Sequence, residues 1–194
     1  MKTRTYGKVV PVAMAAAALA AMTVASPASA ESAAAAVTIK VERVYSESVL
    51  ERRDAFTCPA NQVLTGRSHV GDENKWTTYY CSWIFINGEQ VEVHSGDWTS
   101  SQRESKSSYT APTDQALVGR WHTGDENGMT KYRTGALYWQ GRQVRLTNLP
   151  WSGDYTESNH TVQAGYNQVM TGRSHNGDEN GKTRYQYATV TFEG

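Results

Sequence analysis

Three copies of one stretch of sequence decide the fold of this chain. They read QVLTGRSHVGDENKWTTY at residues 62–79, QALVGRWHTGDENGMTKY at residues 115–132 and QVMTGRSHNGDENGKTRY at residues 168–185, so the offset is 53 residues both times. The copies agree at their Gln, Gly, Arg, His, Gly, Asp, Glu, Asn, Thr and Tyr positions. A fixed internal period is typical of a repeated structural unit. We therefore expect three units of 53 residues.

Each copy predicts a β-hairpin. Apolar and polar residues alternate before the Gly-Asp-Glu-Asn (GDEN) stretch, and Thr and aromatic residues follow it, which is typical of two strands joined by a polar turn. A second hairpin is expected at residues 83–93 and again at residues 136–146, with Asn-Gly and Gln-Gly at the turns. The chain shows no long amphipathic helical pattern after its first thirty residues. The predicted fold class is all-β.

The third unit lacks the second strand of its second hairpin before the sequence ends at Gly194. A candidate for this strand lies near the other end, at residues 37–41, which alternate apolar and polar side chains. Tyr45 lies 53 residues before Trp98, so this region is in phase with the repeats. We expect residues 37–194 to form one domain, a pseudo-threefold β-trefoil or β-prism architecture closed by the N-terminal strand. Closure of this kind removes exposed strand edges.

Residues 1–30 resemble a secretory signal peptide. Basic residues precede an apolar run at residues 9–25, and an Ala-x-Ala motif ends at Ala30. A retained membrane anchor is the alternative, which Pro11 disfavours because it interrupts the apolar run. We expect a secreted, extracellular protein with a flexible N-terminus at residues 31–36.

Composition narrows the possible partners. The 194 residues include 19 basic and 19 acidic side chains, and removal of the signal peptide leaves 16 basic against 19 acidic ones, a net charge of −3. A chain without a basic stripe has little to neutralise phosphates, so we expect no nucleic-acid partner. No later segment is apolar enough to insert into a membrane. This length suits a single domain.

Export also predicts the state of the two cysteines. Cys58 and Cys81 form an even pair in an oxidising compartment, on either side of the first GDEN connection. A disulfide between them closes a loop of about 24 residues and stabilises the fold by about 3 kcal/mol. A reactive thiol or half of a metal site is the competing interpretation.

The repeated polar residues have a structural and a functional interpretation. In the first, the glycines supply turn conformations, the Asp and Asn side chains bond to the backbone, and each Arg pairs with a neighbouring carboxylate. In the second, each unit carries a shallow glycan site, and three sites on one frame gain by avidity. The candidate ligand-binding residues are Arg67, His69, Asp72, Asn74, Arg120, His122, Asp125, Asn127, Arg173, His175, Asp178 and Asn180.

Metal binding has less support in the sequence. The Asp-Glu-Asn run is rich in oxygen but lacks the alternating ligand spacing of a helix-loop-helix calcium site. His69, His122 and His175 could converge on the threefold axis as zinc ligands. A histidine bonded within its own unit, to that unit's Asp or Glu, is the simpler interpretation. We expect no metal and no cofactor.

Catalysis has no clear basis in the repeats. A nucleophile with a base needs an asymmetric constellation, and the hydroxyl beside the repeated His, at Ser68 and Ser174, is replaced by Trp121 in the second copy. The adjacent carboxylates of each copy would have to face those of another unit to act as a glycosidase pair. We expect that the protein is not an enzyme.

One aromatic residue stands in each polar loop region outside the repeats: Tyr45, Trp98 and Trp151. Large aromatic side chains in Ser-rich loops can anchor a protein partner or stack on a ligand. The alternative is that they cap the end of the core.

A small exported protein with a repeated GRxHxGDENGxTxY element resembles the adaptor subunit of the secreted antibacterial assemblies called umbrella toxin particles. The resemblance covers residues 31–194. It implies a protein without catalytic activity that joins a toxin-bearing stalk subunit, through helical repeats, to a subunit with a propeller and a lectin domain. It also implies that residues 31–44 insert into the propeller. This use of the first strand conflicts with its use in closing the ring.

Two function hypotheses follow. The first is an adaptor that holds protein partners through its N-terminal strand and its loop aromatics, at Val37, Ile39, Val41, Val44, Tyr45, Trp98 and Trp151. The second is a multivalent lectin with three equivalent GDEN sites. The adaptor ranks first on the resemblance and on the alternating strand just after the expected cleavage site.

Overall fold

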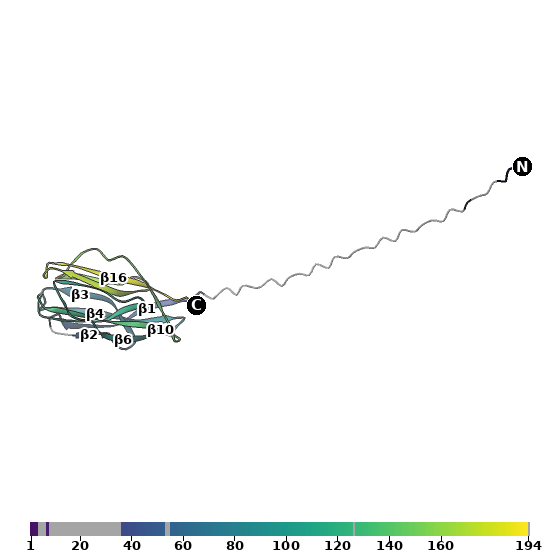
Figure 1. Ribbon diagram of the computed structural model, residues 1–194. Coiled ribbons are helices and arrows are strands. Elements are labelled where there is room, and N and C mark those ends of the chain that lie inside the picture. The colour runs from purple at the N-terminus through teal and green to yellow at the C-terminus, as the bar shows by residue number, and fades with distance from the viewer. Residues whose placement is uncertain (4–6, 8–35, 53–54, 126, 194) are drawn as a thin grey trace. The chain divides into compact units, whose positions relative to one another are not determined.

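The structure is a computed structural model that describes residues 1–3, 7, 36–52, 55–125 and 127–193. The expected signal peptide and residues 31–35 therefore lie outside the described residues, apart from residues 1–3 and 7. From Ala36 onward the described residues form strands and turns without a helix, which confirms the all-β class (Figure 1). Within the described ranges, no helix is long and apolar enough to cross a membrane.

Each copy of the repeat forms the predicted hairpin, with the GDEN stretch at its tip. The paired strands are antiparallel in all three copies. They are β3 (Gln62–Val70) with β4 (Trp76–Ile86), β9 (Gln115–Thr123) with β10 (Met129–Trp139), and β15 (Gln168–Asn176) with β16 (Lys182–Thr191).

Ten further strands in the described residues complete two antiparallel sheets. They are β1 (Ile39–Leu50), β2 (Ala55–Thr57), β5 (Glu89–Gln90), β6 (Glu92–Trp98), β7 (Gln102–Arg103), β8 (Lys106–Thr110), β11 (Arg142–Gln143), β12 (Arg145–Asn148), β13 (Tyr155–Thr156) and β14 (Asn159–Gln163). One sheet has the order β1-β4-β3-β14-β13-β16-β15-β8, with β12 on β16 and β5 on β4. The other has the order β11-β10-β9-β2, with β6 and β7 on β10.

The second hairpins are present but short. Asn87 and Gly88 have φ angles of 51° and 84°, and Gln140 and Gly141 have φ angles of 50° and 73°. Two successive positive φ angles are typical of a type I′ hairpin turn, as the sequence predicts. After two paired residues in β5, the chain leaves β4 and continues as β6 along the next copy. The predicted hairpin partner thus serves mainly as a strand of the following unit.

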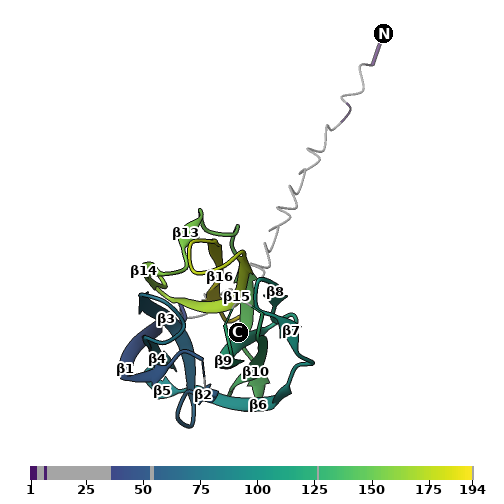
Figure 2. The same cartoon turned by 90° about the vertical axis from the view of Figure 1, so that its left-hand side faces the viewer.

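Short strands link the copies to one another. The strand β2 pairs with β9, β8 pairs with β15, and β14 pairs with β3, so the last linking strand joins the third copy to the first. The central strands β3, β9 and β15 each contact the other two. Viewed end on, the three hairpins lie around a common centre (Figure 2). Non-local pairing therefore connects both ends of the repeat array.

The first strand has a different partner from the predicted one. We expected residues 37–41 to complete the third unit, but β1 pairs along its whole length with β4 of the first copy, from Ile39 opposite Ile86 to Leu50 opposite Trp76. The third copy takes β12 instead, as the second takes β6. The 53-residue phase does not say whether an in-phase strand pairs with the preceding or the following hairpin. Each pairs with the one that follows it, because sequential strands are usually neighbours.

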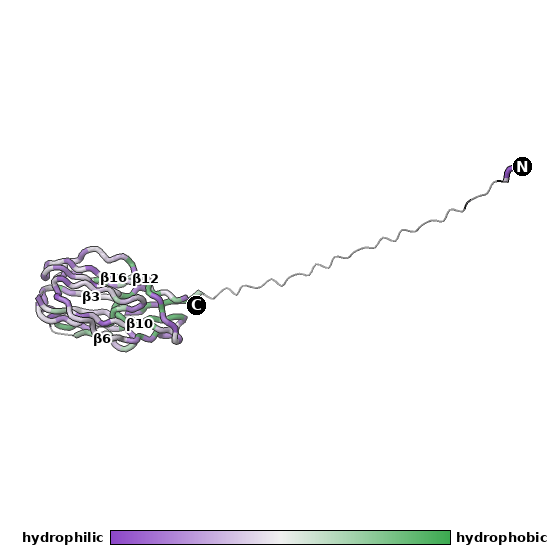
Figure 3. Tube along the Cα trace, in the orientation of Figure 1, coloured by the Kyte–Doolittle hydropathy of each residue, from purple (hydrophilic) through white to green (hydrophobic). Residues whose placement is uncertain are grey.

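Two apolar clusters fill the centre, and each draws equivalent residues from all three copies. The aliphatic cluster includes Val63, Ala116 and Val169, with Ile84, Leu137 and Val190. The aromatic cluster includes Leu64, Leu117 and Met170, with Tyr79, Tyr132 and Tyr185. Hydrophobic segments are most frequent in the half of the β-domain near the C-terminus, whereas the GDEN loops lie at the opposite end of this domain (Figure 3).

The predicted disulfide is confirmed. Cys58 follows β2, Cys81 lies in β4, and the bonded pair has a Cα–Cα distance of 5.8 Å. Both cysteines belong to the buried aromatic cluster. Changing both to Ser is expected to lower the free energy of unfolding by about 3 kcal/mol, because the loop closed by the bond gains entropy in the unfolded chain. Urea denaturation of the variant and of the reduced parent protein measures this loss, and equal stability in all samples would contradict it.

Candidate functional site

Three arginines of the repeats lie inside the protein rather than at its surface. Arg67, Arg120 and Arg173 occupy equivalent positions on β3, β9 and β15, and their side chains are 1–3% exposed. A buried guanidinium requires compensating partners. The glycine before each arginine allows a close strand approach. A Cβ at Gly119 would lie 2.6 Å from the carbonyl oxygen of Phe56, and one at Gly172 would lie 2.8 Å from that of Tyr109.

The partners of the arginines are three buried glutamates that also recur every 53 residues: Glu51, Glu104 and Glu157. Arg67 Nη2 lies 2.9 Å from Glu51 and 2.8 Å from Glu157.

Arg173 lies 2.7 Å from Glu104 and 3.0 Å from Glu157, and Arg120 lies 2.9 Å from Glu104 and also pairs with Glu51. Every arginine therefore bridges two glutamates and every glutamate bridges two arginines. We call this closed ring of six alternating charges the Arg-Glu ring.

The arginines determine the charge state of the glutamates. Burial alone would raise the pKa of Glu104, but Arg120 and Arg173 outweigh this effect and lower the pKa to about 2. The same balance of burial and two arginines holds the pKa of Glu51 and of Glu157 well below its usual range. The ring is therefore charged at neutral pH and has no net charge, so the loss of one member leaves an uncompensated buried charge.

Tyrosines lie against the arginines. Arg120 Nη1 donates to the hydroxyl of Tyr79 at 3.1 Å, and Arg173 Nη1 donates to Tyr132 at 3.3 Å. Arg67 Nη1 donates to Tyr185 at 3.1 Å.

His160 is an addition to the third unit, since the in-phase residue in the second unit is Ser107. Its Nε2 lies 2.8 Å from Arg67 and 2.7 Å from the Tyr185 hydroxyl. Burial, followed by the charge of Arg67, lowers the pKa of His160 to about 4.

Two of the repeated histidines are bonded within their own units. His69 Nδ1 lies 2.8 Å from Thr77 Oγ1 and its Nε2 lies 3.0 Å from the Gly71 carbonyl oxygen. His175 makes the equivalent contacts with Thr183 and Gly177. The hydrogen-bond partners are thus a hydroxyl and a carbonyl, and the carboxylate that the sequence suggested is near in the third unit, where His175 Nδ1 lies 3.7 Å from Glu157. The described residues contain no group of three His, Cys, Asp or Glu side chains that could hold a metal ion.

The second copy departs from this pattern of hydrogen bonds. Thr130 Oγ1 donates to the carbonyl oxygen of Trp121 at 3.1 Å, so it does not repeat the contact that Thr77 makes with its histidine. Within the described residues, Glu104 Oε2 and His122 Nδ1 have no hydrogen-bond partner, although they lie 3.7 Å apart. Burial and the nearby Arg120 lower the pKa of His122 to about 4. One carboxylate oxygen of the Arg-Glu ring is thus without a hydrogen bond.

The GDEN loops form tight turns, as the structural interpretation of the repeat predicts. The Asp72 carboxylate accepts a hydrogen bond from the Asn74 backbone N–H at 3.0 Å, and the Asp125–Asn127 and Asp178–Asn180 pairs repeat this bond at 2.9 Å. Such Asx turns are local structural features. The arginine and histidine donors that a glycan would need are buried below the loops.

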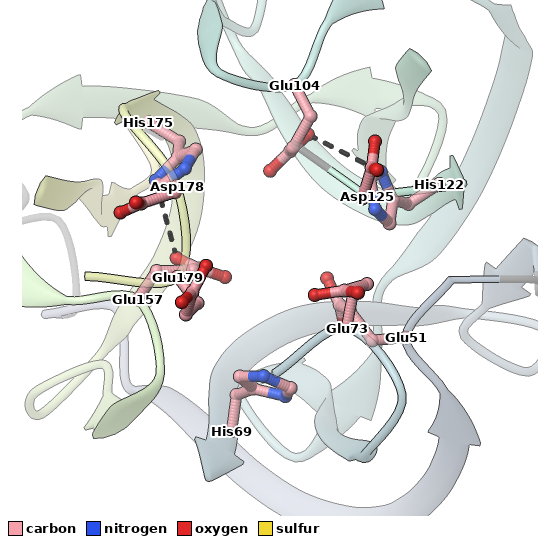
Figure 4. A pocket seen from close by; sticks show the side chains of 10 residues that line it. All are labelled: Glu51, His69, Glu73, Glu104, His122, Asp125, Glu157, His175, Asp178 and Glu179. Carbon is pink, nitrogen blue, oxygen red and sulfur yellow. Dashed lines mark ion pairs between the residues drawn. The ribbon is translucent and has the colours of Figure 1, made fainter. Parts of the chain in front are cut away.

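The three GDEN loops surround a recess of about 30 Å³ at one end of the β-domain, which we call the axial recess. It offers room for one or two water-sized groups. The glutamates of the Arg-Glu ring and the three repeated histidines form its wall, and their side chains come from three sides (Figure 4). Further lining carboxylates come from the loops: Glu73, Asp125, Asp178 and Glu179.

The mouth of the axial recess carries a net negative charge. The ring glutamates are neutralised by the arginines, but Glu73, Asp125, Asp178 and Glu179 form no ion pair with any described residue. Cations are therefore attracted to this end, because carboxylates of one sign in a concave site focus their field. Val70 and Trp76, each 64% exposed, flank the first of the three loops.

The residues predicted to bind partners lie in several places. Val37, Ile39 and Val41 are half-buried against the aliphatic cluster. Val44 is 39% exposed at an irregularity in the pairing of β1, and the Tyr45 hydroxyl donates to Glu47 at 2.7 Å.

Trp98 and Trp151 are half-buried over glycines of the repeats. Their rings lie 3.1 Å and 3.0 Å from the Cβ positions of Gly119 and Gly172. This arrangement favours the interpretation that these tryptophans cap the core.

The glutamates of the ring were missed in the sequence. Glu51, Glu104 and Glu157 stand 53 residues apart, each 16 residues before a repeated arginine. Their surroundings differ between units, so the stretch comparison that located the repeats does not extend to them. A search for single residues at the repeat period would have found them.

Comparison with known proteins adds no assignment. No protein-family description matches this chain, and neither does a curated protein or a solved structure.

Proposed function

We propose that the mature chain is a secreted, non-catalytic adaptor that joins protein subunits of an extracellular antibacterial toxin assembly. The resemblance to umbrella toxin adaptors suggests the partners, a toxin-bearing stalk subunit and a subunit with a propeller and a lectin domain. The adaptor role needs a rigid frame with distinct contact surfaces. The disulfide, the Arg-Glu ring and the non-local strand pairing are features of such a frame.

The proposed frame is a closed, pseudo-threefold β-domain of the trefoil or prism type. Three kinds of recurring contact support it: the hairpins of the copies, the linking strands between them, and the Arg-Glu ring at the centre. In this arrangement the three repeats are closed into a circle by the pairing of β14 with β3, and not by the first strand.

The axial recess is the observation that carries the adaptor proposal. Its loop carboxylates form no ion pair with described residues, and one oxygen of the Arg-Glu ring, Glu104 Oε2, lacks a hydrogen bond within the described residues. A basic side chain from a partner protein fits this chemistry, because a lysine ammonium or arginine guanidinium supplies the donors and the charge that the recess lacks.

The N-terminal segment has a narrower proposed role than the resemblance implies. Residues from Ile39 onward are paired with β4, so insertion of residues 31–44 into a partner would break part of this pairing. Val37 and Thr38, which precede β1, are also held, by packing against the aliphatic cluster and by hydrogen bonds with Asn87. The proposed inserted part is therefore residues 31–36.

The lectin alternative has less support. The arginines and histidines of its three sites are buried, so of the candidate residues only the Asp and Asn side chains lie at the loop surface. A surface of acceptors with few donors and no aromatic platform in every unit is poorly matched to three equivalent glycan sites.

Charge reversal at the axial recess tests the adaptor proposal. The protein and its Asp178→Lys/Glu179→Lys variant are purified from culture supernatant, and copurifying proteins are identified. We expect stoichiometric secreted partners with the parent protein, and at least about a ten-fold loss with the variant, because charged contacts of this kind contribute about 1.5–3 kcal/mol.

The matched control is Glu92→Lys/Asp97→Lys, which reverses two exposed charges on β6. This control should retain its partners. Recovery of the parent protein alone, or equal losses in both variants, would argue against an adaptor that binds through the recess.

A further inference from the structure

A groove on the side of the first unit has no role in the frame described above. It runs between the β1–β4 pair and the connection after β14, as two adjoining hollows of about 160 and 500 Å³. Arg43, Tyr80 and Gln163 line both hollows. We call it the Arg43 groove.

The charge of the groove comes from Arg43. Its guanidinium lies over the Tyr80 ring, 5.0 Å from the ring centre, and it forms no ion pair or hydrogen bond with another described residue. A guanidinium that stacks on an aromatic face keeps its N–H edge available, and that edge matches a carboxylate in a bidentate way. No acidic side chain lines either hollow. The groove therefore offers an uncompensated cation.

The remaining lining is neutral and rich in hydrogen-bonding groups. Thr65 and Ser82 share a buried hydroxyl contact of 2.6 Å at the inner end, and Gln168 Oε1 accepts a hydrogen bond from the Gly165 backbone N–H at 3.0 Å. The Gln163 amide makes no hydrogen bond within the described residues and faces both hollows. Amides, hydroxyls and an aromatic ring around one cation match a ligand with many hydroxyls and one negative charge.

The groove occurs once, although the frame is repeated. The residues in phase with Arg43 are Gly96 and Leu149, and those in phase with Tyr80 are Arg133 and Gln186. The stacked pair is therefore absent from the other two units, which fold without it. The Arg43–Tyr80 pair is therefore not required by the repeated fold, and a binding role would explain its presence.

We propose that the Arg43 groove binds an acidic saccharide, a sugar that carries a carboxylate such as a uronic acid. The Arg43 guanidinium holds the carboxylate, and the Gln163 amide with the neighbouring hydroxyls of the groove holds the sugar hydroxyls. The site differs in place and in charge from the three GDEN loops, and it does not depend on the adaptor role.

The test is a titration of isotope-labelled protein with D-glucuronic acid and with trigalacturonic acid, followed by NMR. We expect saturable shifts at Tyr80 and Gln163, and no comparable shifts with D-glucose. Arg43→Ala should weaken binding about ten-fold or more, because it removes a charged hydrogen-bond donor, while Arg43→Lys should retain part of the affinity. Arg184→Ala, an exposed arginine on β16, is the matched control and should bind like the parent protein.

The proposal is wrong if the acidic sugars cause no saturable shifts, if glucose binds equally well, or if Arg43→Ala binds like the parent protein. A hexaglutamate peptide that binds where the sugars do not would identify the groove as a protein contact instead, and would also overturn it. The Asp178→Lys/Glu179→Lys variant should bind the sugars normally, so the result is separate from that of the adaptor test.

Discussion

Replacing Arg120 with Met is expected to lower the free energy of unfolding by about 3–5 kcal/mol. Arg120 is buried in the Arg-Glu ring, where it compensates Glu51 and Glu104. Its removal leaves two buried carboxylates with one arginine each, and Met fills the volume without supplying charge. Because a domain of this size is stable by only about 5–15 kcal/mol, the variant should be close to unfolding at room temperature. Urea denaturation followed by tryptophan fluorescence measures the difference.

The control is Arg184→Met. Arg184 is 53% exposed and pairs with Asp154 at the surface, where such pairs contribute about 0–1 kcal/mol. If Arg120→Met and Arg184→Met lose the same small amount of stability, the ring is not the structural centre that its geometry indicates. A variant that fails to fold at all agrees with the prediction, and Arg120→Lys, which retains the charge, should then recover part of the stability.

Acidification is expected to destabilise the protein in two stages. His122 and His160 have pKa values of about 4 in the fold, below the value of about 6.5 in an unfolded chain. The unfolded chain therefore binds these protons first, and the stability falls as the pH drops from about 6.5 to about 4. Glu104, with a pKa of about 2 against a usual 4.5, extends the loss from about pH 4.5 to about pH 2. Each group contributes about 3 kcal/mol.

Urea midpoints across this pH range measure the effect, and His160→Ser is the informative variant because Ser107 is the in-phase residue of the second unit. It should reduce the slope between pH 6.5 and pH 4. The exposed His94→Ser is the matched control for the substitution itself. A free energy of unfolding that stays constant from pH 7 to pH 4 would contradict the lowered pKa values of His122 and His160 in the fold.

The hairpins were predictable because they depend on short-range patterns. Alternating side chains, a polar tetrapeptide and an Asn-Gly turn act within about ten residues, and the structure has each hairpin where the repeat placed it. The disulfide was predictable for a similar reason, since Cys58 and Cys81 flank one hairpin tip. The sequence also indicated that each repeated arginine pairs with a carboxylate, but not which one.

The partner of the first strand and the composition of the candidate site were not predictable in this way. The phase of β1 with β6 and β12 is visible in the sequence, yet this phase fits β4 and β16 equally well, and the structure pairs β1 with β4, the hairpin strand nearer to it in sequence. Likewise, Arg67 takes one glutamate 16 residues before it and another, Glu157, from the opposite end of the repeat array. Glu104 Oε2 lacks a hydrogen bond in the second unit, where the Thr130 hydroxyl donates to the carbonyl oxygen of Trp121 instead.

The sequence by itself determined three equivalent hairpins, their polar tips and the disulfide, because local pattern and chain connectivity control these features. Only the tertiary structure decided that the repeated arginines face inward into a closed ring, that the tip carboxylates surround one recess, and that the first strand belongs to the first unit. The physical reason is that a charge pair between units has no signature along the chain. Its partners are selected by which side chains the packed strands bring within hydrogen-bonding distance in a buried place.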